Sequence, residues 1–423
     1  MADRKPPHRI LFMGSLILAG ESIYMLPYLR KSFQTSMEAT FGLSSLEVGT
    51  LNAMFGVLAL LCYLPGGWLA DRFSARRLLT VSLVGTGAGG LYMATIPGYA
   101  GLLVVHAFWG VFSILTFWAA LIKAVRLWSG TDEQGRAFGI LDGGRGVVGA
   151  GLGSIAAVCF GLSASVEAGL VAVIIVYSAA SMLAGAAVWL VVPDDHESFS
   201  GHRSDTRSDD AFDSGRHHVM ASIRETGRTP AVWLIALIIF CAYFSFLGTY
   251  EFPAFAERGF DRSKEFGAWL GAFRDWLRPV AAILAGIIAD RVSASRAILV
   301  SFAVLVLSYA SMSLLPPAAS SISLLWAQIS ATALAVFALR GIYFALLEES
   351  GIPMHLTGIA VGAISMIAYT PDIFAPLLAG WLADTSAGAL GYRRYFGFLA
   401  VIAAIGFTAT AVIRARRQRQ MSD

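Results

Sequence analysis

The chain has 423 residues, of which 57% are hydrophobic and only 14% are charged, and its mean hydropathy is +0.67. Soluble domains carry about 25% charged residues, so this composition excludes a soluble globular protein and requires the bilayer as solvent. The formal net charge of +3 comes from arginines in short loops. Membrane orientation requires such arginines, so they do not indicate a nucleic-acid partner.

Twelve apolar segments approach the length of about 20 residues that a membrane-spanning helix needs. They are expected at residues 10–31, 46–69, 78–97, 100–122, 137–160, 168–192, 231–252, 266–289, 297–316, 321–346, 357–382 and 394–413. We therefore predict an all-α membrane protein with twelve transmembrane helices. They form two six-helix halves, residues 1–192 and 231–423, and the second half ends in a basic tail.

The polar stretch at 193–230 separates the two halves, and two interpretations of it stay open. It is a flexible linker, or it is a regulatory or metal-binding segment around His217 and His218. These histidines lack the carboxylate spacing of a defined metal site, and we predict no metal and no cofactor. Cys62, Cys159 and Cys241 lie in apolar segments and are interpreted as packing residues.

The distribution of arginine predicts the orientation in the membrane. Arginines are frequent in the first residues, in the 67–77 loop, in the linker and in the C-terminal tail, and rarer in the alternate loops. The positive-inside rule then places both termini and the linker in the cytoplasm. The first apolar run lacks a small-residue cleavage site, so no cleavable signal peptide is expected.

Residues 67–77 return as residues 286–296, with a constant offset of 219 residues. A repeat of this length in an apolar chain predicts two pseudo-symmetric membrane halves, as in many transporters. The repeated positions are Gly67, Asp71, Arg72, Arg76 and Arg77 in the first copy, and Gly286, Asp290, Arg291 and Arg296 in the second. Ser295 stands where the first copy has Arg76.

The first copy resembles the loop motif between helices 2 and 3 of the major facilitator superfamily, and the second lies where that family repeats it. The resemblance covers essentially the whole chain and implies that family's fold. It also implies that Asp71 and Asp290 pair with arginine across the halves and hold the cytoplasmic side shut in one state. In the alternative, the arginines only set orientation. Because the second copy has one arginine fewer, we expect the gate at Asp71 to matter more.

The string Tyr28-Leu29-Arg30-Lys31-Ser32-Phe33 is similar to the organophosphate:phosphate antiporter branch. The resemblance implies that Arg30 binds a substrate phosphate. The match is incomplete, because Ser32 replaces an Asn, Tyr63 stands near a helix-2 Lys, and residues 243–250 offer no helix-7 Arg. The strings at 142–146 and 369–373 look more like YihN-type bacterial members.

Charges inside predicted spans are costly in the bilayer and are therefore functional candidates. We predict a substrate site made by Arg30, Arg145, Arg274, Arg278 and Arg340, with Tyr24 and Tyr250 as hydrogen-bonding neighbours. Counting along the helices puts Arg30 near the outer edge, whereas the family resemblance puts it deeper. In the alternative, the arginines pair internally, Arg274 with Asp275 or Glu251 and Arg145 with Asp142 or Glu21.

Glu21 is the first candidate for proton coupling, because an apolar surrounding favours the protonated form of a carboxyl. A structural ion pair is the alternative for Glu21. Asp372, between Pro371 and Pro376, is the second candidate. The prolines predict a broken helix. In the alternative to proton coupling, Asp372 only supports this kink. Five tryptophans, Trp109, Trp118, Trp128, Trp326 and Trp381, are interpreted as belt or packing residues.

These observations predict a secondary transporter of the inner membrane, and not an enzyme. Its substrate would be a small phosphorylated, sulfonated or carboxylated metabolite, moved by alternating access with a proton or in exchange for another anion. We expect a monomer. An exporter of neutral or amphipathic compounds and a membrane sensor without transport are the alternatives. The GxGxxG spacing at 85–90 lies in a span without a preceding strand, and small-residue helix packing explains it.

Overall fold

The computed structural model describes residues 9–129, 134–194, 225–289, 293–317, 322–350, 352 and 354–422. The predicted linker, with His217 and His218, lies almost entirely outside these residues, as do Asp290 and Arg291. Ten helical segments of the described chain are long and apolar enough to cross a membrane. Two further long helices, α4 and α13, bring the described bundle to twelve spans, which confirms the predicted fold class.

The first half contains six spans, of which the first and the fourth are interrupted. The elements are α1 (Arg9–Met25) with α2 (Arg30–Phe41), α3 (Ser45–Arg72), α4 (Ala75–Met93), α5 (Tyr99–Val111) with η1 (Phe112–Trp118) and α6 (Ala119–Ser129), α7 (Gln134–Gly161) and α8 (Val166–Val191). The η1 segment is a π-helical stretch. Such wide turns within α-helices are frequent at functional sites.

The second half repeats this plan. Its elements are α11 (Pro230–Gly248) with η3 (Thr249–Glu251) and α12 (Phe252–Phe260), α13 (Lys264–Ala289), α14 (Ala294–Leu314), α15 (Ile322–Ile342) with η5 (Tyr343–Ala345) and α16 (Leu346–Glu349), α17 (Met354–Ala368) with α18 (Pro371–Asp384), and α19 (Leu390–Ser422). The break between α17 and α18 falls at Tyr369 and Thr370, directly before Pro371, as the prolines predict.

The first span is longer than predicted. Instead of ending near residue 31, it turns at 26–29 and continues as α2 to Phe41. Pro27 lies in this turn and cannot donate a backbone hydrogen bond. The α2 segment is polar, yet Arg30, Gln34 and Thr35 are buried because α2 packs against η3, α12 and α13 of the other half. Hydropathy alone does not detect a polar helix that is buried by other helices of the protein.

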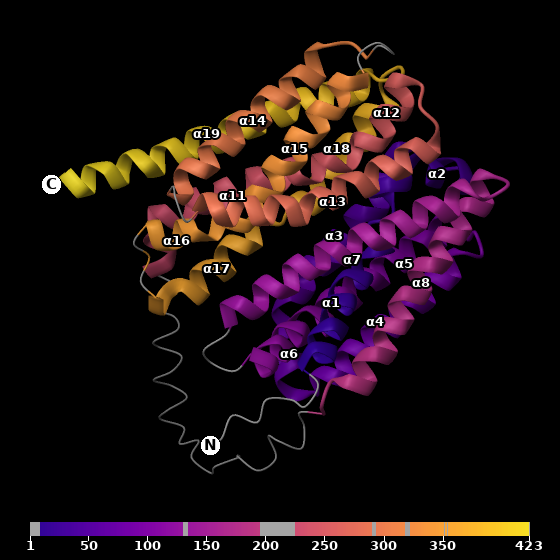
Figure 1. Ribbon diagram of the computed structural model, residues 1–423, viewed down its shortest axis with the longest axis horizontal. Coiled ribbons are helices and arrows are strands. Elements are labelled where there is room, and N and C mark those ends of the chain that lie inside the picture. Colours follow the sequence, from indigo (N-terminus) through magenta and orange to yellow (C-terminus); the bar gives the residue numbers. More distant parts are fainter. Residues whose placement is uncertain are drawn as a thin grey trace.

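The two halves lie side by side and contact each other through α3 with α18, α7 with α13, and α2 with α12 and α13 (Figure 1). We call the end where α2 meets α12 the closed end. The opposite end, where α3 leads into α4 and α8 ends at Val191, is the linker end. Figure 1 shows the ribbons of the two halves diverging from the closed end toward α6 and α17. Both described chain termini lie at the linker end.

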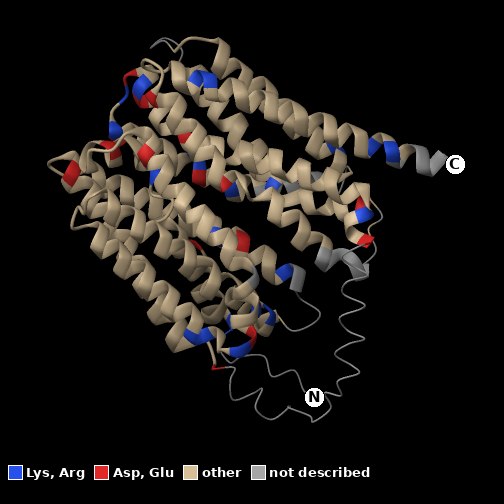
Figure 2. Cartoon of the chain, turned by 180° about the vertical axis from the view of Figure 1, so that it is seen from behind, with Lys and Arg blue, Asp and Glu red and all other residues tan. Residues whose placement is uncertain are grey.

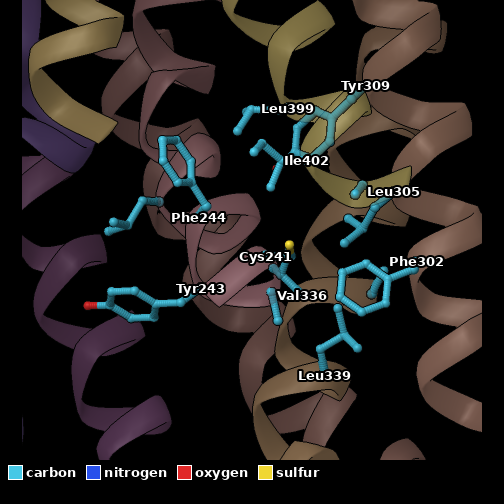
Figure 3. Close-up of a cluster of buried hydrophobic side chains, with 14 of the residues drawn as sticks. Cys241, Tyr243, Phe244, Phe302, Leu305, Tyr309, Val336, Leu339, Leu399 and Ile402 are labelled. Carbon is cyan, nitrogen blue, oxygen red and sulfur yellow. The ribbon is translucent and has the colours of Figure 1, made fainter. Parts of the chain in front are cut away.

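Each half has its own hydrophobic core. In the second half, Cys241, Phe302 and Leu339 belong to a large buried cluster, drawn in Figure 3. The Cys241 sulfur lies among these apolar side chains, as expected for a packing residue. Tyr243 belongs to the same cluster but directs its hydroxyl away from it, toward the other half. The core thus holds the ring while the polar end faces the space between the halves.

The outer face of the bundle carries large exposed apolar residues, including Leu61, Leu183 and Leu307. Figure 2 shows Lys, Arg, Asp and Glu gathered mainly toward the ends of the helices, with few along their middle. A soluble protein rarely exposes so much contiguous apolar surface, whereas a bilayer solvates it. The chain is therefore an integral membrane protein.

Candidate functional site

A cavity of about 360 Å³ lies between the two halves. It receives side chains from α1, α3, η1 and α7 of the first half, and from α11, α13, α15, α17 and α18 of the second. Its charged lining residues are Glu21, Lys31, Arg145, Arg274, Asp275, Arg278, Arg340 and Asp372. The lining therefore holds five basic and three acidic side chains. Four of the five predicted site arginines are among them.

The first charge cluster surrounds Glu21 of α1. Its Oε2 lies 3.4 Å from Arg145 Nε and 3.4 Å from Arg278 Nη1. Arg278 also donates to Asp142 Oδ1 at 2.5 Å, and so connects α13 with α7. A Cβ added at Gly149 would come within 2.7 Å of Glu21 Oε1, so a side chain there would displace this carboxylate. Both arginines thus have acidic partners, which bears out the Arg145–Glu21 alternative.

The second cluster surrounds Asp275 of α13. Arg274 Nη2 lies 2.7 Å from Asp275 Oδ1, and Lys31 Nζ of α2 lies 2.9 Å from Oδ2. Arg274 also donates to the Thr249 carbonyl, and its guanidinium lies 4.9 Å from the Tyr250 ring. Its pairing with Asp275 is one of the two predicted alternatives. The Lys31 contact, which joins the halves, is not foreseen in the sequence.

Arg340 of α15 differs from the other cavity arginines. In the described part of the chain it makes no hydrogen bond and no ion pair, and its guanidinium lies over two aromatic rings. The Cζ atom lies 4.1 Å from the Phe246 ring and 5.6 Å from the Tyr243 ring. Cation–π contacts hold a guanidinium in place but leave its in-plane donors unused. Arg340 therefore offers a two-pronged anion contact to the cavity.

Asp372 is the unpaired acid of the cavity. Its Oδ1 accepts a hydrogen bond from Tyr28 at 3.1 Å, and its Oδ2 accepts one from Tyr243 at 2.8 Å. In the described residues no Lys or Arg lies within ion-pair distance of it. Glu21, the other predicted coupling residue, has two arginines. Asp372 can therefore gain a proton without breaking an ion pair.

Arg30 lies behind the cavity wall, toward the closed end, and is not a lining residue. Its Nη1 donates to Glu251 Oε1 at 2.6 Å and to Gln34 Oε1 at 3.0 Å. Both members of the Arg30–Glu251 pair are buried, with 3% and 0% of their side chains exposed. In this conformation Arg30 thus joins the two halves. Its predicted role toward a substrate remains a prediction.

The predicted tyrosines, Tyr24 and Tyr250, both line the cavity. The sequence prediction does not include Lys31, Asp275, Tyr28, Tyr243 and Tyr369, which line it too. Trp118, interpreted as a belt or packing residue, also contributes to the lining from η1. Aromatic residues inside a span are common, so only their position around the cavity distinguishes these from packing residues.

The gating positions lie at the linker end. Asp71 and Arg72 are exposed, and Arg72 lies 4.1 Å from the Trp68 ring. Arg76 and Arg77 contact Asp194 Oδ2, at the start of the linker, at 2.9 and 3.1 Å. In the described residues Asp71 forms no ion pair. The latch across the halves therefore stays a prediction, as do the roles of Gly67, Gly286 and Arg296, and Asp290 and Arg291 lie outside the described residues.

Charged side chains facing a cavity between two six-helix membrane halves define a transporter. In the described residues no group of three or more His, Cys, Asp or Glu could hold a metal ion. Residues 10–371 match the model of the Major Facilitator Superfamily, and the chain belongs to this family. It is accordingly a secondary transporter rather than an enzyme.

Individual relatives agree with this assignment. The chain is 27% identical over 411 residues to the inner membrane protein YihN of Escherichia coli K12, covering 96% of each chain. It is 27% identical over 109 residues to a D-galactonate transporter of Escherichia coli O6:H1, 26% of this chain and 25% of that one. The structure of a bacterial homologue of the lysosomal transporter Spinster, inward-facing and occupied, aligns with a TM-score of 0.72 at 15% identity, covering 97% of each chain.

Proposed function

We propose that this protein transports a small organic anion across the inner membrane by alternating access. The observation that carries the proposal is Arg340, a guanidinium that faces the cavity without an acidic partner in the described residues. A partly buried cation without an ion-pair partner is costly, and a bound anion would reduce that cost. Arg suits carboxylate, phosphate and sulfonate groups because it donates two parallel hydrogen bonds.

The balance of charge in the cavity supports an anion as well. Lys31 and Arg274 share Asp275, Arg145 and Arg278 share Glu21, and Arg278 also pairs with Asp142. Arg340 adds one further positive charge. The tyrosines around them offer hydroxyl groups that suit a hydroxylated substrate. The partial match to a D-galactonate transporter, whose printed substrate is a sugar acid, favours a carboxylate within this class.

We further propose that the linker end faces the cytoplasm, with both termini inside. Arginines of the 67–77 loop and of the α19 tail lie at this end. The diverging ribbons in Figure 1 then correspond to an inward-facing conformation. We also propose a functional monomer, because one chain supplies side chains to the cavity from both of its halves.

A thermal-shift screen of the purified full-length protein tests the anion proposal, because a ligand stabilises the state that it binds. The probes are D-galactonate, a sugar phosphate and a sugar sulfonate, each beside the uncharged sugar of equal size. We expect at least one anion to raise the melting temperature while its neutral counterpart does not. Arg340→Gln should abolish the shift, and Arg126→Gln, which changes an exposed arginine outside the cavity, should retain it.

The main alternative is an exporter of neutral or amphipathic compounds with its arginines internally paired. The pairs around Glu21 and Asp275 favour that alternative for Arg145, Arg274 and Arg278, but they do not account for Arg340. Stabilisation by neutral sugars with no response to any anion would reject the anion proposal in favour of this alternative.

A further inference from the structure

Asp372 joins the two halves of the protein through tyrosine hydroxyls rather than through an ion pair. Tyr28, in the turn between α1 and α2, belongs to the first half, whereas Tyr243 of α11 belongs to the second. Tyr28 packs against buried clusters of both halves, and its ring lies 5.9 Å from that of Tyr250. Asp372 therefore lies where the halves meet, on the wall of the cavity.

The surroundings of Asp372 are tight on the side of α3. A Cβ added at Gly56 would come within 3.1 Å of the Asp372 carbonyl carbon, so α3 and α18 approach closely at this level. Asp372 is also in the first turn of α18, where the helix N-terminus stabilises a negative charge. The titratable and charged side chains near enough to act on its charge are Tyr24, Tyr28, Tyr63, Tyr243, Tyr250 and Arg340 around the cavity, and Arg30 behind the cavity wall.

Alternating access requires the closed end to open in the opposite state. The Tyr28 hydroxyl then leaves Asp372, because the two residues belong to different halves, while Tyr243 stays. A carboxylate that loses one of its two hydrogen-bond donors is less stable as an ion. Opening the closed end therefore favours a proton on Asp372, and closing it favours release of that proton.

Anion binding and protonation reinforce each other at this place. Tyr243 bonds Asp372 and lies beneath the guanidinium of Arg340, so the acid and the anchoring arginine share one neighbour. An anion on Arg340 adds negative charge near Asp372 and disfavours its ionised form. By thermodynamic linkage, a proton on Asp372 must then favour anion binding to the same extent.

We propose that Asp372 is a proton-binding site, clasped by Tyr28 and Tyr243, which makes this protein a proton–anion symporter. The proton comes from water on the side of the closed end and is returned to water at the linker end, with no bond broken in the substrate. The proposal builds on the proposed function, because it makes the companion of the anion a proton rather than a counter-anion.

A measurement without substrate tests whether the hydrogen bonds from Tyr28 and Tyr243 to Asp372 couple protonation to opening of the closed end. Spin labels on non-canonical amino acids at Leu162 and Leu315, exposed residues at the closed end of opposite halves, report its opening in the full-length protein. We expect the population with long distances between the two labels to increase when the pH is lowered from mildly alkaline to mildly acidic. Asp372→Asn mimics the protonated acid. At both pH values it should show the distance distribution that the wild type has at acidic pH. Glu225→Gln, which neutralises an exposed acid outside the cavity, is the control and should keep the wild-type shift.

Tyr28→Phe is the second variant, because it removes the hydroxyl that joins the halves and keeps the ring. We expect it to populate long distances at alkaline pH, where the wild type is closed. A wild type that does not respond to pH, an Asp372→Asn variant that shifts like the wild type, or a closed Tyr28→Phe each overturns the proposal. Because no ligand is added, these outcomes are separate from a failure of anion binding in the thermal-shift screen.

Discussion

The closed end and the part of the cavity around Arg340 and Asp372 differ in whether their charges are paired. At the closed end, Arg30 pairs with Glu251 and Arg258 with Glu38, in each case across the two halves. In the cavity, Arg340 rests on aromatic rings and Asp372 accepts only from tyrosines in the described residues. Pairing across the halves stabilises one conformation, whereas an unpaired charge is available to a ligand. We therefore expect the paired charges to hold this state and the unpaired charges to bind what is carried.

The largest expected effect is at the closed end. Glu251→Gln leaves Arg30 buried without its acidic partner, and breaking a buried pair in this way costs about 3–5 kcal/mol. We expect a clear fall in the melting temperature of the purified protein. Arg30→Gln in the same background should recover part of the loss, because it removes the orphaned charge. If Glu251→Gln melts like the wild type, the pair does not hold the halves together.

The next effect concerns Arg340 and ligand affinity rather than stability. Arg340→Gln removes a charge-assisted contact worth about 1.5–3 kcal/mol, which is roughly 10- to 100-fold in Kd. Calorimetric titration with the anion found in the thermal-shift screen measures this loss. Arg340→Lys should recover part of the affinity, because it keeps the charge but not the two-pronged geometry. Equal affinity in all three proteins would place the anion elsewhere.

Glu21 occupies an intermediate position in the comparison, since it pairs with two cavity arginines at 3.4 Å. Glu21→Gln frees Arg145 and partly frees Arg278, so we expect anion binding to become tighter. The gain should be about 0.5–1.5 kcal/mol, as for a typical net hydrogen bond. The same titration measures it. Weaker binding in Glu21→Gln would instead give Glu21 a direct part in holding the substrate.

Hydropathy and arginine counts could predict the twelve helices and the two halves, because the bilayer imposes these features locally. Four site arginines could be found because a charge within a span is costly wherever the helix lies. Two pairings, Arg145–Glu21 and Arg274–Asp275, could be named because the charges were few.

The rest depends on contacts that sequence spacing does not encode. Arg30 and Glu251 are separated by 221 positions, and Lys31 and Asp275 by 244. The link that Arg30 makes between the halves in this conformation could therefore not be foreseen, and its role toward a substrate stays a prediction. The distinctive feature of Arg340 is that no described residue pairs with it, and only the arrangement of α15 among its neighbours shows this.

The smallest effect is expected at the linker end, where the charges are partly exposed. Asp194→Asn removes the shared partner of Arg76 and Arg77, whose side chains are 25% and 59% exposed. Exposed pairs contribute about 0.2–1 kcal/mol, so the melting temperature should fall slightly and the anion Kd should not change. Asp71→Asn is the matched control, because Asp71 forms no ion pair with the described residues in this conformation. If Asp71→Asn lowers the melting temperature more than Asp194→Asn does, the predicted latch contributes to this state. If only transport slows in Asp71→Asn, the latch belongs to the state that is closed at the linker end.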